Sequence, residues 1–228
     1  MENDRRQFLA ATAALGLSSV ALSAGRVRGD EKNEPEEVSA VEDLMREHGV
    51  LNRILLIFEE GLRRAREKND LSPEMFHAPA ALVRKFVEDY HEKLEENFIF
   101  PEFEKRKKLV DLVKVLREQH QAGRKVTDVI LRSAVPDRFR HDDARTEVIT
   151  ACRAFIRMYR PHEAREDTAL FPALGKLLSR QRLAELGEQF EAEEDRLFGD
   201  EGFEKTVDQV AAIEKQLGIY DLSQFTPK

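Results

Sequence analysis

The sequence predicts an all-α protein: an antiparallel up-down-up-down four-helix bundle with a pseudo-twofold repeat, followed by two C-terminal helices. Two observations support this fold class, and the chain length adds that a core can form. From Val38 onward the apolar residues recur at helical spacing, and no segment alternates with period two for long enough to form a strand. Only 11 Gly and 8 Pro are present, which leaves long stretches without helix-breaking residues. At 228 residues, the chain is long enough to bury a core of its own.

Four amphipathic stripes within residues 38–178 predict the bundle helices. The stripes cover residues 41–62, 83–98, 113–130 and 149–170, and the breaks between them are expected at residues 69–73, 106–109 and 136–142. We expect residues 179–228 to form a C-terminal helical extension. Its two helices are predicted at residues 179–198, with Ser179 as the N-cap, and at residues 203–217.

An internal repeat is the most informative feature of the chain. Residues 91–101 (HEKLEENFIFP) align without a gap with residues 162–172 (HEAREDTALFP). Upstream, Glu47-His48 corresponds to Gln119-His120. A repeated pair of helices predicts a bundle whose two halves are related by a pseudo-twofold axis.

The composition and charge exclude several classes of protein and site. The chain has 44 acidic and 37 basic residues and a net charge of −7, which argues against nucleic-acid binding. No unbroken apolar run is long enough for a multi-span membrane protein. The single cysteine, Cys152, excludes an internal disulfide and a thiolate-ligated metal site. A metal would therefore have to be held by imidazole and carboxylate groups.

The N-terminal residues are typical of an export signal. Arg5-Arg6 precedes an apolar run over residues 10–24, a pattern that resembles the twin-arginine signal. We therefore expect residues 1–30 to hold the signal peptide and the start of a linker, and residues 31–37 to be an acidic linker. The pattern predicts a periplasmic protein without stable membrane insertion after signal removal. An uncleaved membrane anchor and a frayed N-terminal helix are the alternatives.

Four histidines are expected at one level of the bundle. Two residues on neighbouring antiparallel helices lie level when the turn falls midway between them. The midpoints fall at residues 69–70, 105–106 and 141, each on or beside a predicted turn. The histidines of this layer are His48, His91, His120 and His162. His77 and His141 lie in the breaks and are not expected to join them.

Two carboxylates are expected to face the same layer. Glu95 and Glu166 follow His91 and His162 by four residues, which places each pair on one helix face. Carboxylates buried in an apolar core are costly unless a cation compensates them. The predicted metal ligands are His48, His91, Glu95, His120, His162 and Glu166. Glu96 and Asp167, one residue further along, are the competing ligands.

This donor set favours two metal ions rather than one. Each glutamate can bridge two ions, and six side chains are more than a single ion usually binds. Nitrogen and oxygen ligands suit iron, and zinc and manganese are also possible. No catalytic residue is predicted.

These residues resemble the hemerythrin-like (HHE cation-binding) family over residues 38–178. The shared feature is the paired His-x-x-x-Glu that ends in Phe-Pro. The resemblance implies a non-haem di-iron site, to which all six predicted ligands correspond by position. Oxygen-carrying hemerythrins have a further His one turn after the third-helix ligand, where this chain has Arg124. They also use an Asp five residues after the last His, which corresponds to Asp167.

Together with the expected export signal, the resemblance implies an exported di-iron protein that binds or senses a small diatomic ligand, oxygen or nitric oxide. The absence of a fifth His implies a more open and more symmetric site than that of a dedicated oxygen carrier. Arg124 would either place positive charge near a bound anion or reach solvent. The alternatives are a redox enzyme acting on nitric oxide or peroxide, an iron-centre repair protein, and a metal-free helical interaction module. The sequence does not identify a protein partner.

Overall fold

The computed structural model describes residues 39–67 and 71–227. The expected export signal and acidic linker lie outside the described residues, as does the predicted turn at Asn69-Asp70. Residues from Ser39 onward form one compact unit, in which the described part is helical and contains no strand. The all-α prediction is therefore confirmed. None of the described helices is both long and apolar enough to cross a membrane.

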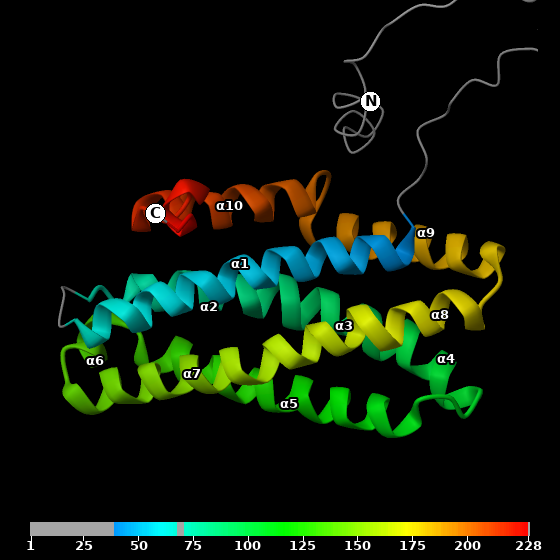
Figure 1. The fold of residues 1–228 in the computed structure, drawn as a ribbon, viewed down its shortest axis with the longest axis horizontal. Helices are drawn as coiled ribbons and strands as arrows, with labels where there is room; N and C mark the ends of the chain where they lie inside the picture. Colours follow the sequence, from blue (N-terminus) through cyan, green and yellow to red (C-terminus); the bar gives the residue numbers. More distant parts are fainter. Residues whose placement is uncertain (1–38, 68–70, 228) are drawn as a thin grey trace, which may run out of the picture. The chain divides into compact units, whose positions relative to one another are not determined.

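Four long helical arms form the bundle (Figure 1). The first and third arms are single helices, α1 (Ala40–Arg66) and α5 (Val110–Ser133). The second arm runs through consecutive segments: α2 (Glu74–Leu82), η3 (Val83–His91), α3 (Glu92–Leu94), η4 (Glu95–Ile99) and α4 (Phe100–Lys105). The fourth arm consists of α7 (Asp142–Arg165), η5 (Glu166–Leu170) and α8 (Phe171–Leu177). A short helix that the sequence did not predict, α6 (Pro136–Phe139), lies in the break before α7.

The second and fourth arms widen at equivalent places. The segments η4 and η5 are π-helical turns: the N–H of Phe100 donates to the carbonyl of Glu95, and that of Phe171 donates to Glu166. Pro101 and Pro172 follow directly. Because proline lacks an N–H and its ring crowds the carbonyl four residues earlier, a helix must widen or kink there. The repeat seen in the sequence is therefore also a repeat of this π-helical turn, whereas the longer π-helical segment η3 has no counterpart in the fourth arm.

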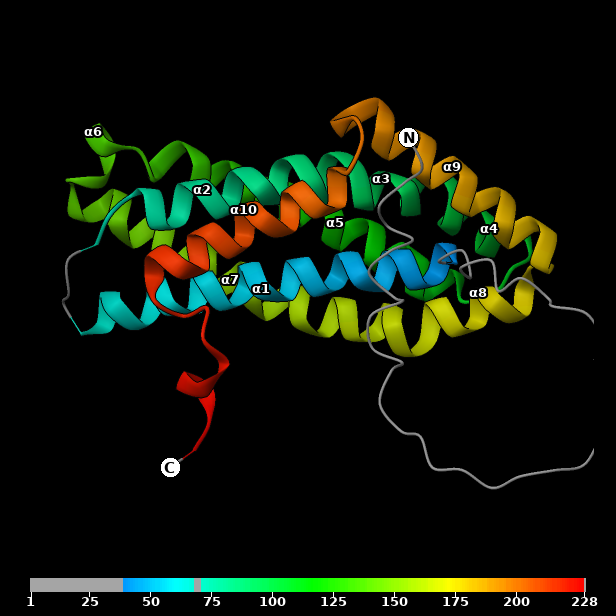
Figure 2. The ribbon, with the colours of Figure 1, turned by 90° about the horizontal axis from the view of Figure 1, so that it is seen from above.

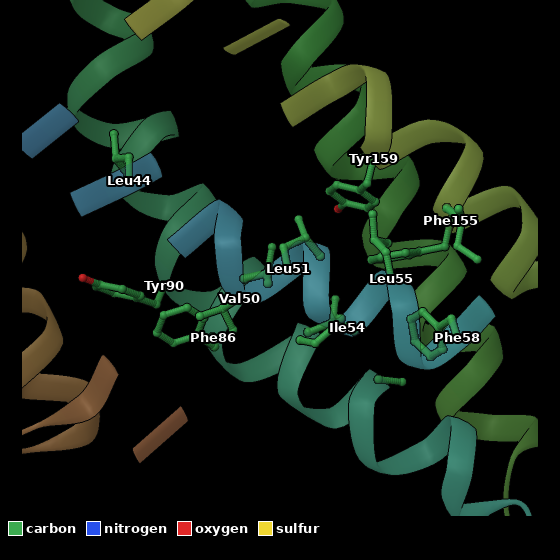
Figure 3. Close-up of a cluster of buried hydrophobic side chains, with 14 of the residues drawn as sticks. Leu44, Val50, Leu51, Ile54, Leu55, Phe58, Phe86, Tyr90, Phe155 and Tyr159 are labelled. Carbon is green, nitrogen blue, oxygen red and sulfur yellow. The ribbon is translucent and has the colours of Figure 1, made fainter. Parts of the chain in front are cut away.

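The apolar core lies between the four arms and continues to the C-terminal helices, where Phe86 packs against Phe198 and Phe203. Figure 3 shows part of it, with Leu51 and Phe58 from α1, Phe86 from η3 and Phe155 from α7. These four side chains are at most 2% exposed. Burial of this kind stabilises a fold by about 25 cal/mol for each Å² of apolar surface removed from water.

The C-terminal helices pack onto one side of the bundle. They are α9 (Arg180–Phe198) and α10 (Gly202–Leu217), and α10 runs along α1 and α2 (Figure 2). The Ser179 hydroxyl accepts a hydrogen bond from the N–H of Arg182, which confirms the predicted N-cap. Arg53 on α1 donates two hydrogen bonds to Glu214 on α10, at 3.0 and 2.6 Å. A short 3-10 helix, η6 (Leu222–Phe225), follows.

Candidate metal centre

The structure brings all six predicted ligands together in the core. Glu95, His120, His162 and Glu166 offer ligand atoms that all lie within 4.8 Å of one another, and so do His48, His91 and Glu95. Each of the six side chains is at most 4% exposed. They come from all four arms, and Glu95 belongs to both groups.

Each carboxylate lies between imidazoles from the two halves of the repeat. The Oε2 atom of Glu95 is 3.9 Å from Nε2 of His91 and 3.3 Å from Nε2 of His120. In the other half, Oε2 of Glu166 is 3.1 Å from Nε2 of His162 and 3.4 Å from Nε2 of His48. This position, between two pairs of imidazoles, is the one that a bridging carboxylate needs.

The four imidazoles share one orientation, with Nε2 facing the carboxylates and Nδ1 facing outward to a hydrogen-bond partner. The Nδ1 partners are Asp167 for His48 (2.8 Å), Glu47 for His91 (2.7 Å), Glu96 for His120 (3.2 Å) and Gln119 for His162 (2.9 Å). Because an ionised carboxylate only accepts, Nδ1 carries the hydrogen and Nε2 remains available to a metal. Metal-ligating histidines are usually held in this way.

Glu96 and Asp167, the competing ligands, lie on the outer side of the imidazoles. Each contacts the Nδ1 atom of a histidine rather than the space between the Nε2 atoms. In the structure, Glu95 and Glu166 occupy the centre instead.

The pseudo-twofold relation extends to the packing around the imidazoles. Phe171 stacks on His48 with ring centroids 5.4 Å apart and an interplanar angle of 23°. Phe100 stacks on His120 at 5.5 Å and 24°. In both cases the phenylalanine follows a π-helical turn and covers a histidine from the other half of the repeat.

The electrostatics of the centre favour a cation. Within the described part of the chain, none of the four carboxylate oxygens of Glu95 and Glu166 has a hydrogen-bond partner of normal geometry. Burial and the neighbouring Glu166 raise the pKa of Glu95 well above its usual range. Burial lowers the pKa of His120 to about 4, despite its contact with Glu96. Bound cations would compensate the desolvated carboxylates, so the residues present fit a metal centre.

A family comparison agrees with this geometry. The model of the hemerythrin HHE cation binding domain matches residues 39–174, with a second match over residues 111–217. The chain belongs to this hemerythrin family. It is also similar to uncharacterized proteins of Mycobacterium bovis and Mycobacterium tuberculosis. These are 46% identical over 231 residues, covering 97% of this chain and 91% of theirs. No solved structure matches the chain.

Arg124 occupies the position of the further histidine of oxygen-carrying hemerythrins, and it does not simply reach solvent. Its guanidinium lies 2.6 Å from Oε2 of Glu92 and 2.8 Å from Oε1 of Glu96, and its side chain is 21% exposed. The Tyr159 hydroxyl donates to the other oxygen of Glu92 at 2.6 Å. In this hemerythrin-like chain, positive charge is therefore held beside the outer partner of His120.

The remaining histidines and the cysteine do not join the centre. His141 is exposed at the N-terminus of α7, and His77 lies in α2. Cys152 is buried, and burial raises the pKa of its thiol.

Sequence reasoning missed the roles of Glu47, Gln119, Glu92 and Tyr159. Two of them could have been noticed from their position in the sequence, because Glu47 and Gln119 directly precede the histidines of α1 and α5.

Proposed function

We propose that this hemerythrin-family protein is an exported non-haem di-iron protein that binds or senses a small diatomic ligand such as oxygen or nitric oxide. One observation carries the proposal: six buried donor groups converge, and the two central carboxylates lack hydrogen bonds. Without cations, such a set would place costly carboxylates in an apolar core. This disfavours the metal-free interaction module.

His48 and His91 would hold one ion, and His120 and His162 the other. Glu95 and Glu166 would bridge, because each already lies between imidazoles of both halves. When bound, two irons supply reversible redox chemistry toward oxygen or nitric oxide. Zinc and manganese also accept this donor set, so the metal has to be identified by measurement.

The chain's own residues orient the donors and exclude water. The Nδ1 contacts fix the tautomer and the ring orientation of each imidazole. Phe100 and Phe171, both fully buried, cover two of the rings. Burial of this kind would let small, weakly polar ligands reach the centre more readily than hydrated anions.

Metal analysis combined with absorption spectroscopy tests the proposal. We expect about two irons per chain and a spectrum that changes on addition of azide or nitric oxide. Fewer than one metal per chain in protein purified from its native compartment would overturn it. Reversible oxygen release from the reduced, iron-loaded protein would indicate binding, whereas irreversible oxidation with steady-state turnover would favour the redox enzyme.

Export through the twin-arginine route is a separate part of the proposal and rests on Arg5-Arg6 and the apolar run that follows. Replacing both arginines by lysine is expected to keep the protein in the cytoplasm of a host with an active twin-arginine system. Unchanged fractionation of the variant would contradict this route.

A further inference from the structure

The two halves of the centre differ in the outer partners of their histidines, which are the side chains that contact the Nδ1 atoms. Glu47, which accepts from His91, corresponds in the repeat to Gln119, which accepts from His162. The geometry is nearly the same, with contacts of 2.7 and 2.9 Å. The chemistry is different, because the amide of Gln119 carries no charge.

The second pair of outer partners differs in the same sense. Asp167 contacts His48, and its equivalent Glu96 contacts His120. Glu96 also pairs with Lys93 at 2.6 Å and with Arg124 at 2.8 Å. Among the described residues, the only ion-pair partner of Asp167 is His48.

A carboxylate that accepts the Nδ1–H of a histidine makes the imidazole a stronger donor to metal, and removal of such a partner typically costs 10- to 100-fold in metal affinity. A neutral amide has a weaker effect, and so does a carboxylate that is already paired with two cations. The His48–His91 pair therefore has a carboxylate partner on each imidazole. The His120–His162 pair has one neutral amide and one carboxylate, and that carboxylate is also paired with two cations.

We infer that the two metal positions are inequivalent: the His48–His91 position binds a divalent cation first and more tightly, and the charge difference between Glu47 and Gln119 sets this order. The inference rests on the proposed function, because it assumes that both positions bind metal. It assigns Glu47 and Gln119 as positioning residues that act through the histidines.

Titration of the metal-free, full-length protein with Co²⁺ tests the order. Calorimetry of the wild-type protein is expected to resolve two steps that differ by about tenfold or more in affinity. Glu and Gln side chains have almost the same shape, so the residue types at positions 47 and 119 can be exchanged with little change in packing. Glu47→Gln should weaken the tighter step about tenfold, and Gln119→Glu should strengthen the weaker step. Glu118→Gln, on an exposed neighbour of Gln119, is the matched control and should leave both steps unchanged.

Proton NMR of the cobalt-loaded protein shows which position fills first. At one equivalent of Co²⁺, the shifted imidazole N–H signals should be those of His48 and His91, and the Glu47→Gln, Gln119→Glu double variant should reverse this order. Two steps of equal affinity, or steps unaffected by either exchange, would overturn the inference and leave the di-metal proposal intact. Absence of any Co²⁺ binding by the wild-type protein would overturn both.

Discussion

The hydroxyl of Tyr159 on α7 donates to Glu92 at 2.6 Å and lies where a β-carbon on Gly123 would be. A β-carbon placed on Gly123 would come within 2.1 Å of the Tyr159 oxygen. The third and fourth arms can therefore approach this closely only because residue 123 is glycine.

Gly123→Ala is expected to destabilise the protein by about 1–3 kcal/mol, because Tyr159 must move and a buried hydrogen bond is lost. Urea unfolding measures this change. Gly175→Ala is the matched control: outside its own stretch of helix, no atom lies within 4 Å of a β-carbon placed there, and alanine is the better helix former. Tyr159→Phe should recover part of the loss in the Gly123→Ala background. Equal effects at Gly123 and Gly175 would contradict this account.

Metal loading at pH 7.5 is expected to release about one proton per chain. Burial opposes protonation of His48, but its hydrogen bond to Asp167 and the nearby carboxylate of Glu166 raise its pKa to about 10. At pH 7.5 His48 therefore carries an additional proton in the metal-free protein and must lose it on ligation. Calorimetry in buffers of different ionisation enthalpy counts the protons. Asp167→Asn should reduce the number by about one, and a buffer-independent enthalpy would refute the prediction.

The metal-free protein is expected to lose stability as the pH rises from 6.5 to 8. Burial raises the pKa of Glu163 to about 8 from its ordinary 4.5, so the folded state holds a proton that the unfolded state has released. Each such group lowers the free energy of unfolding by about 1.4 kcal/mol per pH unit until the folded pKa is reached. His48, with its pKa raised to about 10, acts in the same direction above pH 6.5.

Urea unfolding of the protein in the presence of a metal chelator, at pH 6.5 and at pH 8, measures this loss of stability. Glu163→Gln should make the decline shallower, because the variant lacks the carboxyl group that titrates. The Gln carbonyl can still accept a hydrogen bond from the Asn52 amide, so this contact is kept. A decline of the same steepness in the variant would assign the effect to other groups.

Glu95→Gln is expected to have opposite effects on stability and on metal binding. In the metal-free protein at pH 7.5 it should raise the free energy of unfolding by roughly 1–3 kcal/mol, because it removes a buried acid without hydrogen bonds. It should also reduce the metal content below two ions per chain. Unfolding experiments with chelator and metal analysis without it check the two effects. A variant that loses stability in the metal-free state would contradict the prediction.

The sequence was sufficient for the helices, the repeat and the single layer of histidines. Helical spacing fixes which face each residue occupies, and the position of a turn fixes which residues lie level. The break at residues 106–109 lies, as predicted, between α4, which ends at Lys105, and α5, which begins at Val110.

The outer partners were harder to predict, because they depend on how one helix rotates against its neighbour. Glu47 lies next to His48 in the sequence, yet its carboxylate contacts His91 on another arm. The π-helical turns were also missed. Pro101 and Pro172 predict some distortion, but whether a helix kinks or widens depends on the packing around it.

The placement of Phe100 and Phe171 makes each half of the repeat dependent on the other. Phe171 covers His48, and Phe100 covers His120. Each phenylalanine therefore comes from one half of the repeat and covers a histidine of the other half. A fragment holding only the first two arms would carry Phe100 but would lack the imidazole that this ring covers. Such a fragment could complete the metal centre by associating with a second copy of itself, which would then supply the missing histidine and phenylalanine.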